Sequence, residues 1–247
     1  MINIKDQMYD FTRVNYQRLL KMALRKHKIG SVADYQLSDL TCLWRHDVDI
    51  SPQSALAMAK IEHDEGVCAT YYFLVRSDFY NVFEPAVVTI IKSIQAMGHE
   101  VGLHFDADQC DISSTEALEL ALIREKNALE TLIDVNIRSF SFHNPSSETS
   151  RFKSFSYAGL INAYNSELFE RFEYCSDSNG YWRFTTLEEF LDKSYPNICV
   201  LTHPVWWQDE VLSPRARIIR SIEGRAAATL ERYDTLLDGA GRKNIST

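Results

Sequence analysis

The sequence predicts an α/β protein in which parallel strands alternate with helices. Short apolar segments rich in β-formers alternate with helical segments about every 30 to 35 residues, the length of a βα unit. Polar residues follow the apolar segments directly, and helix-start signals come next. The 247 residues are also enough for a single barrel. The pattern therefore favours one parallel barrel or a wound sheet.

The first half of the chain predicts three strands with helices before and after them. Its elements are a helix over 6–28, a strand over 42–46, a helix over 51–65, a strand over 67–75, a helix over 84–97 and a strand over 99–104. Apolar residues recur at helical spacing in the helices, whereas the strands are short runs of β-branched and aromatic residues. A glycine follows each helix, at Gly30, Gly66 and Gly98, as expected of a helix end.

The second half is assigned from the same signals. It has helices from Ser113 to about Ile133, from Thr185, and from Ser213 to about Leu237, with strands over 137–143, 159–164, 173–176 and 198–203. The first two helices begin with Ser/Thr-x-x-Glu capping boxes, and the last begins with Ser-Pro. We expect a single domain over 1–247, with an N-terminal helical extension over 1–40 and a flexible tail over 239–247.

Composition indicates an ordinary globular protein and excludes some classes of partner. Hydrophobic residues make up 45%, and the net charge is −8 with no basic stripe, so we expect no nucleic-acid partner. Five separated cysteines without a Cys-x-x-Cys pair argue against a disulfide framework and a zinc finger. We find no signal-peptide segment and no stretch long enough to span a membrane, so we expect a cytoplasmic protein. The oligomeric state stays open.

Two aspartates directly after the strand at 42–46 form the centre of the candidate site. Asp47 and Asp49 precede the helix that starts at Ser51, and ligands of α/β folds bind at such strand ends. Residues two apart in an extended chain point the same way. Two like charges this close need a cation or must share a proton. A metal site is the simpler explanation.

Histidines and more aspartates follow other strands. They are His104 with Asp106 and Asp108, His143, and His203. Taken singly, each has a structural explanation as a buried histidine, a loop residue or a brace for a turn. Together they lie at the same end of consecutive strands, where carboxylates and imidazoles can hold a divalent metal and leave positions open. The coincidence therefore predicts a catalytic metal centre.

Three segments resemble the motifs of polysaccharide deacetylases, the NodB-homology or carbohydrate esterase family 4 group. They are Arg-His-Asp-Val-Asp at 45–49, Gly-His-Glu-Val-Gly-Leu-His at 98–104 and Leu-Thr-His-Pro at 201–204. The resemblance covers about residues 43–207. It implies a distorted (β/α)7 barrel of the TIM-like kind, and a metal-dependent deacetylase that hydrolyses the N-acetyl amide of a sugar or saccharide precursor. Surface polysaccharide or lipopolysaccharide biosynthesis is the expected context.

The resemblance also implies roles for single residues. Asp47 matches the catalytic base and His203 the general acid, and the implied metal ligands are Asp49, His104 and Asp108. Asp108 stands where the family has a second histidine, and Asp106 is its rival. The residues expected to line the substrate pocket are His143, Asn144, Asp177, Trp206 and Trp207. Alternatively, Asp177 belongs to a polar turn, and the two tryptophans pack against the barrel rim.

Several points remain alternatives at this stage. The arginine that orients the base in this family is missing near His143, and either Arg45 or His143 could replace it. We expect one divalent metal ion, zinc first, with cobalt, nickel, manganese or iron as alternatives. A set of two carboxylates and one histidine would favour harder ions and make a weaker Lewis acid. The competing functions are a non-catalytic relative that binds a glycan, and a metal hydrolase of another amide or of an ester.

Overall fold

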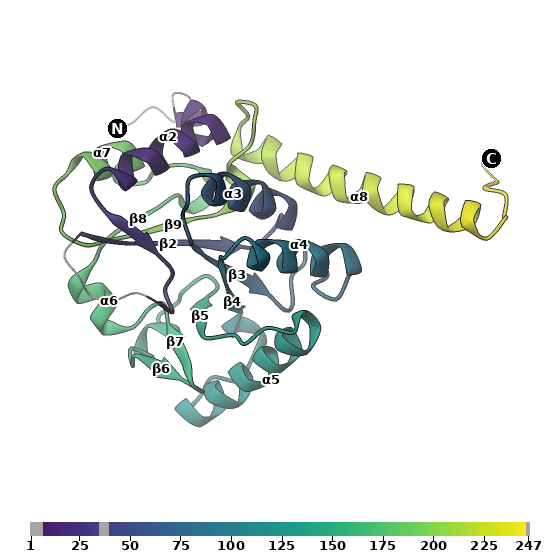
Figure 1. The fold of residues 1–247 in the computed structure, drawn as a ribbon. Helices are drawn as coiled ribbons and strands as arrows, with labels where there is room; N and C mark the ends of the chain where they lie inside the picture. The colour runs from purple at the N-terminus through teal and green to yellow at the C-terminus, as the bar shows by residue number, and fades with distance from the viewer. Residues whose placement is uncertain (1–6, 35–39, 246–247) are drawn as a thin grey trace.

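The computed structural model describes residues 7–34 and 40–245 (Figure 1). The start of the predicted first helix, part of the predicted N-terminal extension and the last two residues of the predicted tail lie outside these ranges. None of the helices in the described ranges is both long and apolar enough to cross a bilayer.

A curled sheet of seven parallel strands forms the framework of the described chain. In spatial order the strands are β7 (Leu160–Asn162), β5 (Ser139–Phe142), β4 (Glu100–Phe105), β3 (Thr70–Leu74), β2 (Thr41–Val48), β9 (Ile198–Thr202) and β8 (Glu173–Ser176). β6 (Ser156–Tyr157) pairs antiparallel with β7, and β1 (Lys28–Gly30) pairs with the start of β2. In the ranges described, β7 and β8 do not pair, so the barrel stays open there. The predicted single-domain α/β fold, a distorted (β/α)7 barrel, is confirmed.

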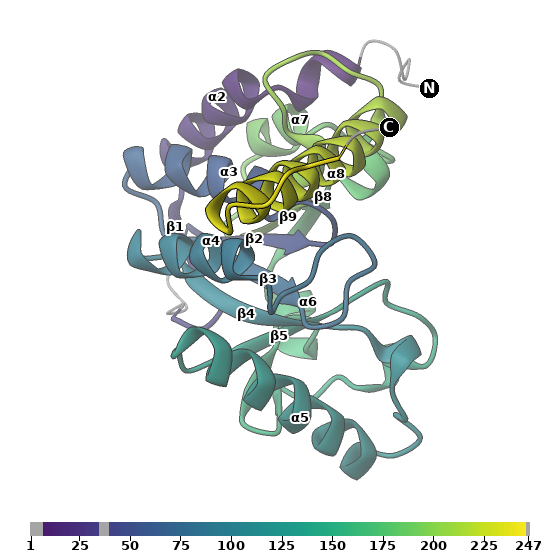
Figure 2. The ribbon, with the colours of Figure 1, turned by 90° about the vertical axis from the view of Figure 1, so that its right-hand side faces the viewer.

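Helices cover the outside of the sheet. They are α2 (Arg13–Leu24), α3 (Pro52–Asp64), α4 (Pro85–Ala96), α5 (Thr115–Ile133), α6 (Ser166–Arg171), α7 (Leu187–Asp192) and α8 (Pro214–Gly239). Short 3-10 turns occur at η1 (Met8–Phe11), η2 (Ala107–Gln109), η3 (Thr149–Arg151), η4 (Ser178–Gly180) and η5 (Pro204–Trp206). Figure 2 shows α2, α3, α4 and α5 following one another along the sheet, and Figure 1 shows α8 projecting from the body.

Most helix starts agree with the predicted signals. Ser51 caps α3 and Ser213 caps α8, each followed by proline. The two capping boxes are shifted by one residue, because Ser114 rather than Ser113 caps α5, and the box that opens α7 joins Thr186 and Glu189. Both helix starts have two adjacent serines or threonines in the sequence, and the second of the two is the N-cap in the structure.

The N-terminal region differs from a plain helical extension. Thr12 caps α2, so this helix begins later than predicted and buries Tyr16, Leu19 and Leu20, while Val14 is exposed. β1 then joins the main sheet beside β2. Three residues are too few to produce a periodic pattern, which is why the sequence did not reveal this strand.

β2 separates two environments. All eight of its residues are buried, and successive side chains point to opposite faces of the sheet. His46 contacts Glu62 of α3 on the outer face, whereas Asp47 accepts a hydrogen bond from Ser141 of β5. The alternation therefore directs Asp47 to the barrel interior, where the strand ends meet.

Candidate metal centre and catalytic groups

Four parallel strands of the sheet bring the predicted site residues to one end of the barrel. Asp47 lies in β2 and Asp49 directly after it, while His104 lies near the end of β4. His143 follows β5, and His203 follows β9. Because these strands run parallel in one sheet, with β3 between β2 and β4, their carboxyl ends share one edge. The structure thus gathers residues from positions 47 to 203 at a single site.

Asp49, His104 and His143 form a compact group of possible metal ligands. One ligand atom from each lies within 4.8 Å of the other two. His104 Nε2 is 3.0 Å and His143 Nδ1 is 3.5 Å from Asp49 Oδ1, and the two imidazole nitrogens are 3.2 Å apart. Three strands therefore contribute one ligand each.

The hydrogen bonds of this group leave its possible ligand atoms facing one another. His104 Nδ1 is 3.0 Å from the carbonyl oxygen of Ser141, which can only accept, so Nδ1 donates and Nε2 is the ring nitrogen that faces Asp49. Asp49 Oδ1 is buried without a hydrogen-bond partner among the described residues. A buried oxygen and two imidazole nitrogens converging on one point fit a divalent cation.

The local charges keep Asp49 ionised. Burial alone would raise the pKa of its carboxyl group, but the close imidazoles of His104 and His143 and the charge of His203 hold this pKa well below its usual range. Burial by itself would lower the pKa of His143, but the nearby Asp49 carboxylate outweighs this effect and raises the pKa above the usual value. The group is thus built around a stable carboxylate.

Asp47 has one oxygen held and one oxygen free. Ser141 Oγ donates to Asp47 Oδ2 at 3.1 Å, and Arg45 Nη2 lies 3.6 Å from the same oxygen. Asp47 Oδ1 is buried with no hydrogen-bond partner in the described ranges. Arg45 is itself buried, donates to Tyr164 Oη at 2.8 Å and lies over that ring at 4.6 Å. Of the two candidates for the missing arginine, Arg45 is the one beside Asp47.

His203 and Asp177 form a hydrogen-bonded pair. His203 Nδ1 is 2.6 Å from Asp177 Oδ1, and Trp207 Nε1 donates to Asp177 Oδ2 at 2.8 Å. Burial lowers the pKa of His203, but the hydrogen bond and charge of Asp177 outweigh it and raise the pKa to about 9. His203 is therefore protonated at neutral pH, with Nε2 3.9 Å from Asp49 Oδ2.

Asp108 does not lie with the group that it was predicted to complete. β4 ends at Phe105, and the chain turns into η2, where Asp108 is exposed and its N–H donates to Asp106 Oδ1. Its rival Asp106 lines the adjacent pocket but is not part of the group within 4.8 Å. The third position beside Asp49 and His104 is taken by His143, which the sequence had suggested as a substrate contact.

Three residues predicted to touch substrate lie in the protein interior instead. Asp177 is 0% exposed and its oxygens face His203 and Trp207. Trp206 and Trp207 belong to the main apolar core, where Trp207 packs on Phe11. Burial leaves these side chains no surface for a sugar, and the rim-packing alternative describes the tryptophans. Asn144 remains at the site, with Nδ2 2.9 Å from His143 Nε2.

A pocket of about 220 Å³ opens beside the metal group. Its lining comprises Asp49, Leu74, Arg76, Ser77, Asp78, Phe79, Asp106, Gln109 and His143. The segment from Arg76 to Phe79 was not predicted as part of the site. It follows β3, and the position of this strand between β2 and β4 is the signal that could have identified it.

Comparison with known proteins gives similar structures only. No family model matches the chain, and no curated protein matches it in sequence. A family 4 acetyl xylan esterase from Clostridium thermocellum, in complex with cobalt, is 15% identical over 74% of this chain and 84% of that chain, with a TM-score of 0.42. The chitin deacetylase of Colletotrichum lindemuthianum is 14% identical over 74% and 81%, with a TM-score of 0.42. A family 4 pseudoenzyme from Bacillus anthracis is 13% identical over 83% and 67%, with a TM-score of 0.45.

Proposed function

We propose that this protein is a metal-dependent deacetylase that hydrolyses the N-acetyl amide of a sugar or saccharide precursor. The observation that carries the proposal is the arrangement of Asp49, His104 and His143 between a carboxylate with a free oxygen, Asp47, and a protonated histidine, His203. The three motifs that resemble polysaccharide deacetylases contain four of these five residues. The proposed context is surface polysaccharide biosynthesis.

The proposed metal ligands are Asp49 Oδ1, His104 Nε2 and His143 Nδ1, with His143 in place of Asp108. Two imidazoles and one carboxylate with open positions are a ligand set of catalytic zinc sites, so zinc is the proposed ion. Bound there, a divalent metal polarises the acetyl carbonyl and lowers the pKa of a water molecule. The Asn144 side-chain amide contacts His143 Nε2. With the amide turned so that its oxygen faces Nε2, the imidazole proton stays on Nε2, and the Nδ1 lone pair is free to bind the metal.

Asp47 is the proposed general base. Its free Oδ1 accepts the proton of the attacking water, while Ser141 and Arg45 hold Oδ2 in place. The Arg45 guanidinium stays protonated at neutral pH and has no acceptor atom. It therefore pairs with the carboxylate without competing for the proton that Asp47 accepts. We therefore assign Arg45 as the residue that positions the base.

His203 is the proposed general acid. Asp177 accepts a hydrogen bond from Nδ1, which leaves the Nε2 proton to face the site. An amine leaves an amide readily only after its nitrogen is protonated, and a histidine with a pKa of about 9 carries that proton at neutral pH. The base and the acid thus act on the same bond, and the acid carries its proton before the reaction begins.

The pocket suits a small polar substrate group. Its volume of about 220 Å³ is small, and its lining supplies donors and acceptors from Arg76, Ser77 and Gln109. Sugars are recognised through such polar side chains combined with an aromatic surface, here Phe79. An N-acetyl group attached to one sugar unit fits these features.

The test combines metal content with a substrate screen. We expect wild type to bind one equivalent of zinc by elemental analysis and to release acetate from N-acetylated sugars. His143→Ala should lose the metal, whereas Asp108→Ala, its matched control on the exposed η2 turn, should keep it. Metal-free wild type that takes up none on titration would refute a metal hydrolase and favour glycan binding. Metal without amide hydrolysis, but with ester cleavage, would favour the other hydrolase.

A further inference from the structure

We propose that two copies of this chain associate through α8, with the two helices packed antiparallel about a twofold axis. α8 has 26 residues, which makes it about 39 Å long. It projects from the body in the ribbon view of Figure 1. Of its side chains only Arg217, near its start, is buried, and beyond that Arg225 and Arg232 reach Glu84 at 3.2 and 3.7 Å.

A lone helix of this kind lacks the support that helices in proteins normally have. Isolated helices are marginal in water, and most helical stability comes from packing one apolar face. On α8 the outer turns have no such packing on the body, since Leu230, Tyr233 and Leu236 are 65%, 54% and 64% exposed. A covering surface would supply the missing contacts.

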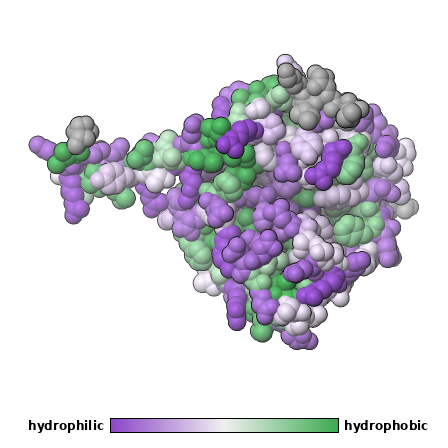
Figure 3. Space-filling view, turned by 180° about the vertical axis from the view of Figure 1, so that it is seen from behind, coloured by the Kyte–Doolittle hydropathy of each residue, from purple (hydrophilic) through white to green (hydrophobic). Residues whose placement is uncertain are grey.

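α8 carries a continuous apolar stripe on one side. Its residues follow one another at intervals of three or four and are Ile219, Ile222, Ala226, Leu230, Tyr233 and Leu237. This spacing places them on one face of a helix. Figure 3 shows hydrophobic surface along the projecting helix and where it joins the body. We call this face the α8 stripe.

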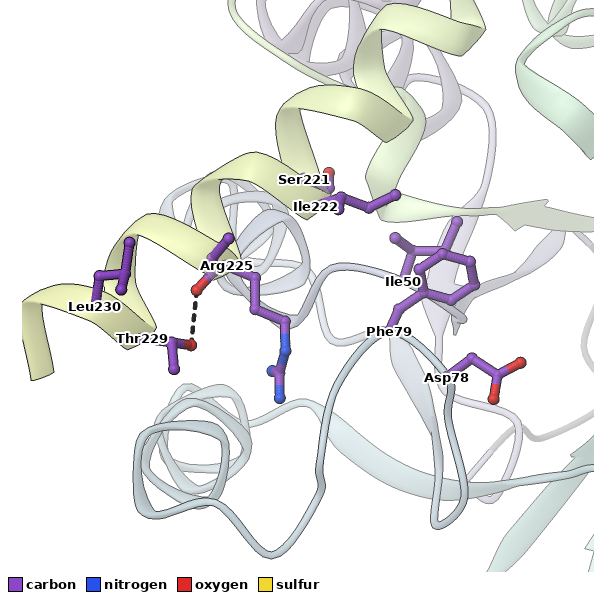
Figure 4. A pocket seen from close by; sticks show the side chains of 9 residues that line it. Ile50, Asp78, Phe79, Ser221, Ile222, Arg225, Thr229 and Leu230 are labelled. Carbon is purple, nitrogen blue, oxygen red and sulfur yellow. Dashed lines mark hydrogen bonds between the residues drawn. The ribbon is translucent and has the colours of Figure 1, made fainter. Parts of the chain in front are cut away.

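The inner part of the α8 stripe forms one wall of a pocket of about 620 Å³. Ile222, Ala226 and Leu230 line it from the helix, and Ile50 and Phe79 line it from the body (Figure 4). The pocket is larger than the catalytic one and is open on the outside. It therefore offers an apolar seat beside the stripe for a second helix.

The charges of α8 favour a second copy in the antiparallel orientation. Residues 214–226 contain four arginines and one glutamate, a net charge of +3, and residues 227–239 contain three acidic residues and one arginine, a net charge of −2. Arg220 and Arg225 pair with Glu210 and Glu84, and with these two glutamates counted the first half still has a net charge of +1. An antiparallel pair places the basic half of each helix beside the acidic half of the other, whereas a parallel pair places like charges together. The helix dipoles also oppose one another in this orientation.

The area available is adequate for a stable dimer. One side of a helix of this length and about 10 Å in diameter offers on the order of 500 Å². In a twofold pair each copy also contributes the seat around Ile50 and Phe79, which brings the interface toward the roughly 800 Å² per partner of stable complexes. The arrangement is self-complementary, so it closes at two copies.

Phe79 connects this interface with the catalytic pocket, because Asp78 and Phe79 line both. The outer half of the partner helix would therefore lie along the rim of the active site. The dimer does not depend on the proposed function, and its test uses no substrate.

The test is the mass of the whole protein in solution, measured by light scattering during size-exclusion chromatography at micromolar concentrations. We expect about 57 kDa for wild type, twice the 28.5 kDa of one chain. Leu230→Glu places a charge in the α8 stripe and should give a single chain. Thr235→Glu places the same charge on the opposite side of the helix and should remain a dimer. Both positions are exposed in the single chain, so both variants should stay folded, with the wild-type circular dichroism spectrum at room temperature.

A cross-link checks the orientation. After oxidation, the Ala226→Cys variant, changed at the middle of α8, should form a disulfide between the new cysteines of the two chains. The Gly239→Cys variant, changed at the end of the helix, should form such a disulfide only in a parallel pair. Wild-type protein oxidised in the same way is the control for cross-links through the exposed Cys68. A single-chain mass for wild type, a dimeric Leu230→Glu, equal dissociation of both glutamate variants, or cross-linking through Gly239→Cys would each overturn the proposal.

Discussion

Two clusters of histidine and acidic side chains lie on opposite faces of β2, and they differ in whether their polar atoms are satisfied. On the outer face, Glu62 receives hydrogen bonds from His46 at 2.7 Å, from Tyr71 at 2.6 Å and from Tyr16. His99 lies beside it, with its Nδ1 accepting from the N–H of Ala69 and its Nε2 donating to the carbonyl of Ala59. We call this set the outer cluster.

The inner cluster, which contains Asp47 and Asp49 on the other face of β2, has the same residue types but leaves carboxylate oxygens unpaired. Asp47 Oδ1 and Asp49 Oδ1 are buried without partners among the described residues, whereas neither oxygen of Glu62 is left over. A fully bonded buried network rigidifies a core, and an incomplete one costs stability unless something binds there. Burial and residue type therefore do not distinguish the two clusters. The buried carboxylate oxygens without a hydrogen-bond partner do distinguish them.

The largest expected effect is on turnover at the inner cluster. Asp47→Asn removes the proposed base while keeping its shape, so we expect a loss of about 10²–10⁴-fold in kcat. Zinc content should stay at the wild-type level, since Asp47 is not among the proposed ligands. Normal turnover in this variant, measured with the best N-acetylated sugar, would contradict the assignment of the base.

The next effect is on stability at the outer cluster. Glu62→Ala leaves His46, Tyr16 and Tyr71 buried without their acceptor, so the free energy of unfolding should fall by about 3–5 kcal/mol in urea titrations. Asp49→Ala is the matched variant of the inner cluster. In metal-free protein it should cost less than Glu62→Ala, because it removes the contacts with His104 and His143 but leaves no buried tyrosine hydroxyl without its acceptor. Equal losses in the two variants would argue that both clusters are structural.

A third effect separates the acid from the base through pH. Asp177→Asn removes the charge that raises the pKa of His203, so this pKa should fall from about 9 toward the usual histidine range. Activity requires protonated His203 and is lost as pH rises through its pKa, so the alkaline limb of the kcat profile should move to lower pH. Activity at pH 8 should drop about tenfold or more, with less change at pH 6. An unmoved alkaline limb would mean that another group is the acid.

The smallest effect is the pH dependence of stability at the outer cluster. Burial lowers the pKa of His99, so the unfolded chain binds this proton more readily than the folded one. Stability from this source is complete above about pH 6.5 and is lost as pH falls below it. His99→Gln should flatten the decline in melting temperature between about pH 6.5 and pH 5. A decline as steep as that of wild type would place the titrating group elsewhere.

Much of the fold was predictable because long elements carry strong periodic signals. The strand ends that bear Asp47, His104 and His203, and the helices α3, α4, α5 and α8, agree with the sequence pattern within a few residues. β1, β6 and α6 have two to six residues each, too few for a pattern. Their presence depends on contacts with elements that are distant in the sequence.

The candidate site was predictable by strand but not always by residue. Arg45 and Asp47 are two apart in β2 and so share a face, which the sequence allows one to infer. The exchange of Asp108 for His143 was not visible, since it depends on where β4 stops and on β5 lying beside it. The burial of Asp177 likewise follows from β8 pairing with β9, a contact over about 26 residues that leaves no local trace.

The strand order also sets the sequence in which the active site is made during synthesis. β2, β3, β4 and β5 are neighbours in chain order, so the three proposed metal ligands are all present once residue 143 has been made. β9 pairs with β2 on the other side and brings His203 some 60 residues later. At ribosomal rates of roughly 5–20 residues per second, that interval lasts several seconds. The nascent protein thus acquires the proposed ion-binding half of the site before the proposed proton donor, and the last parallel strand to be translated completes the proposed site.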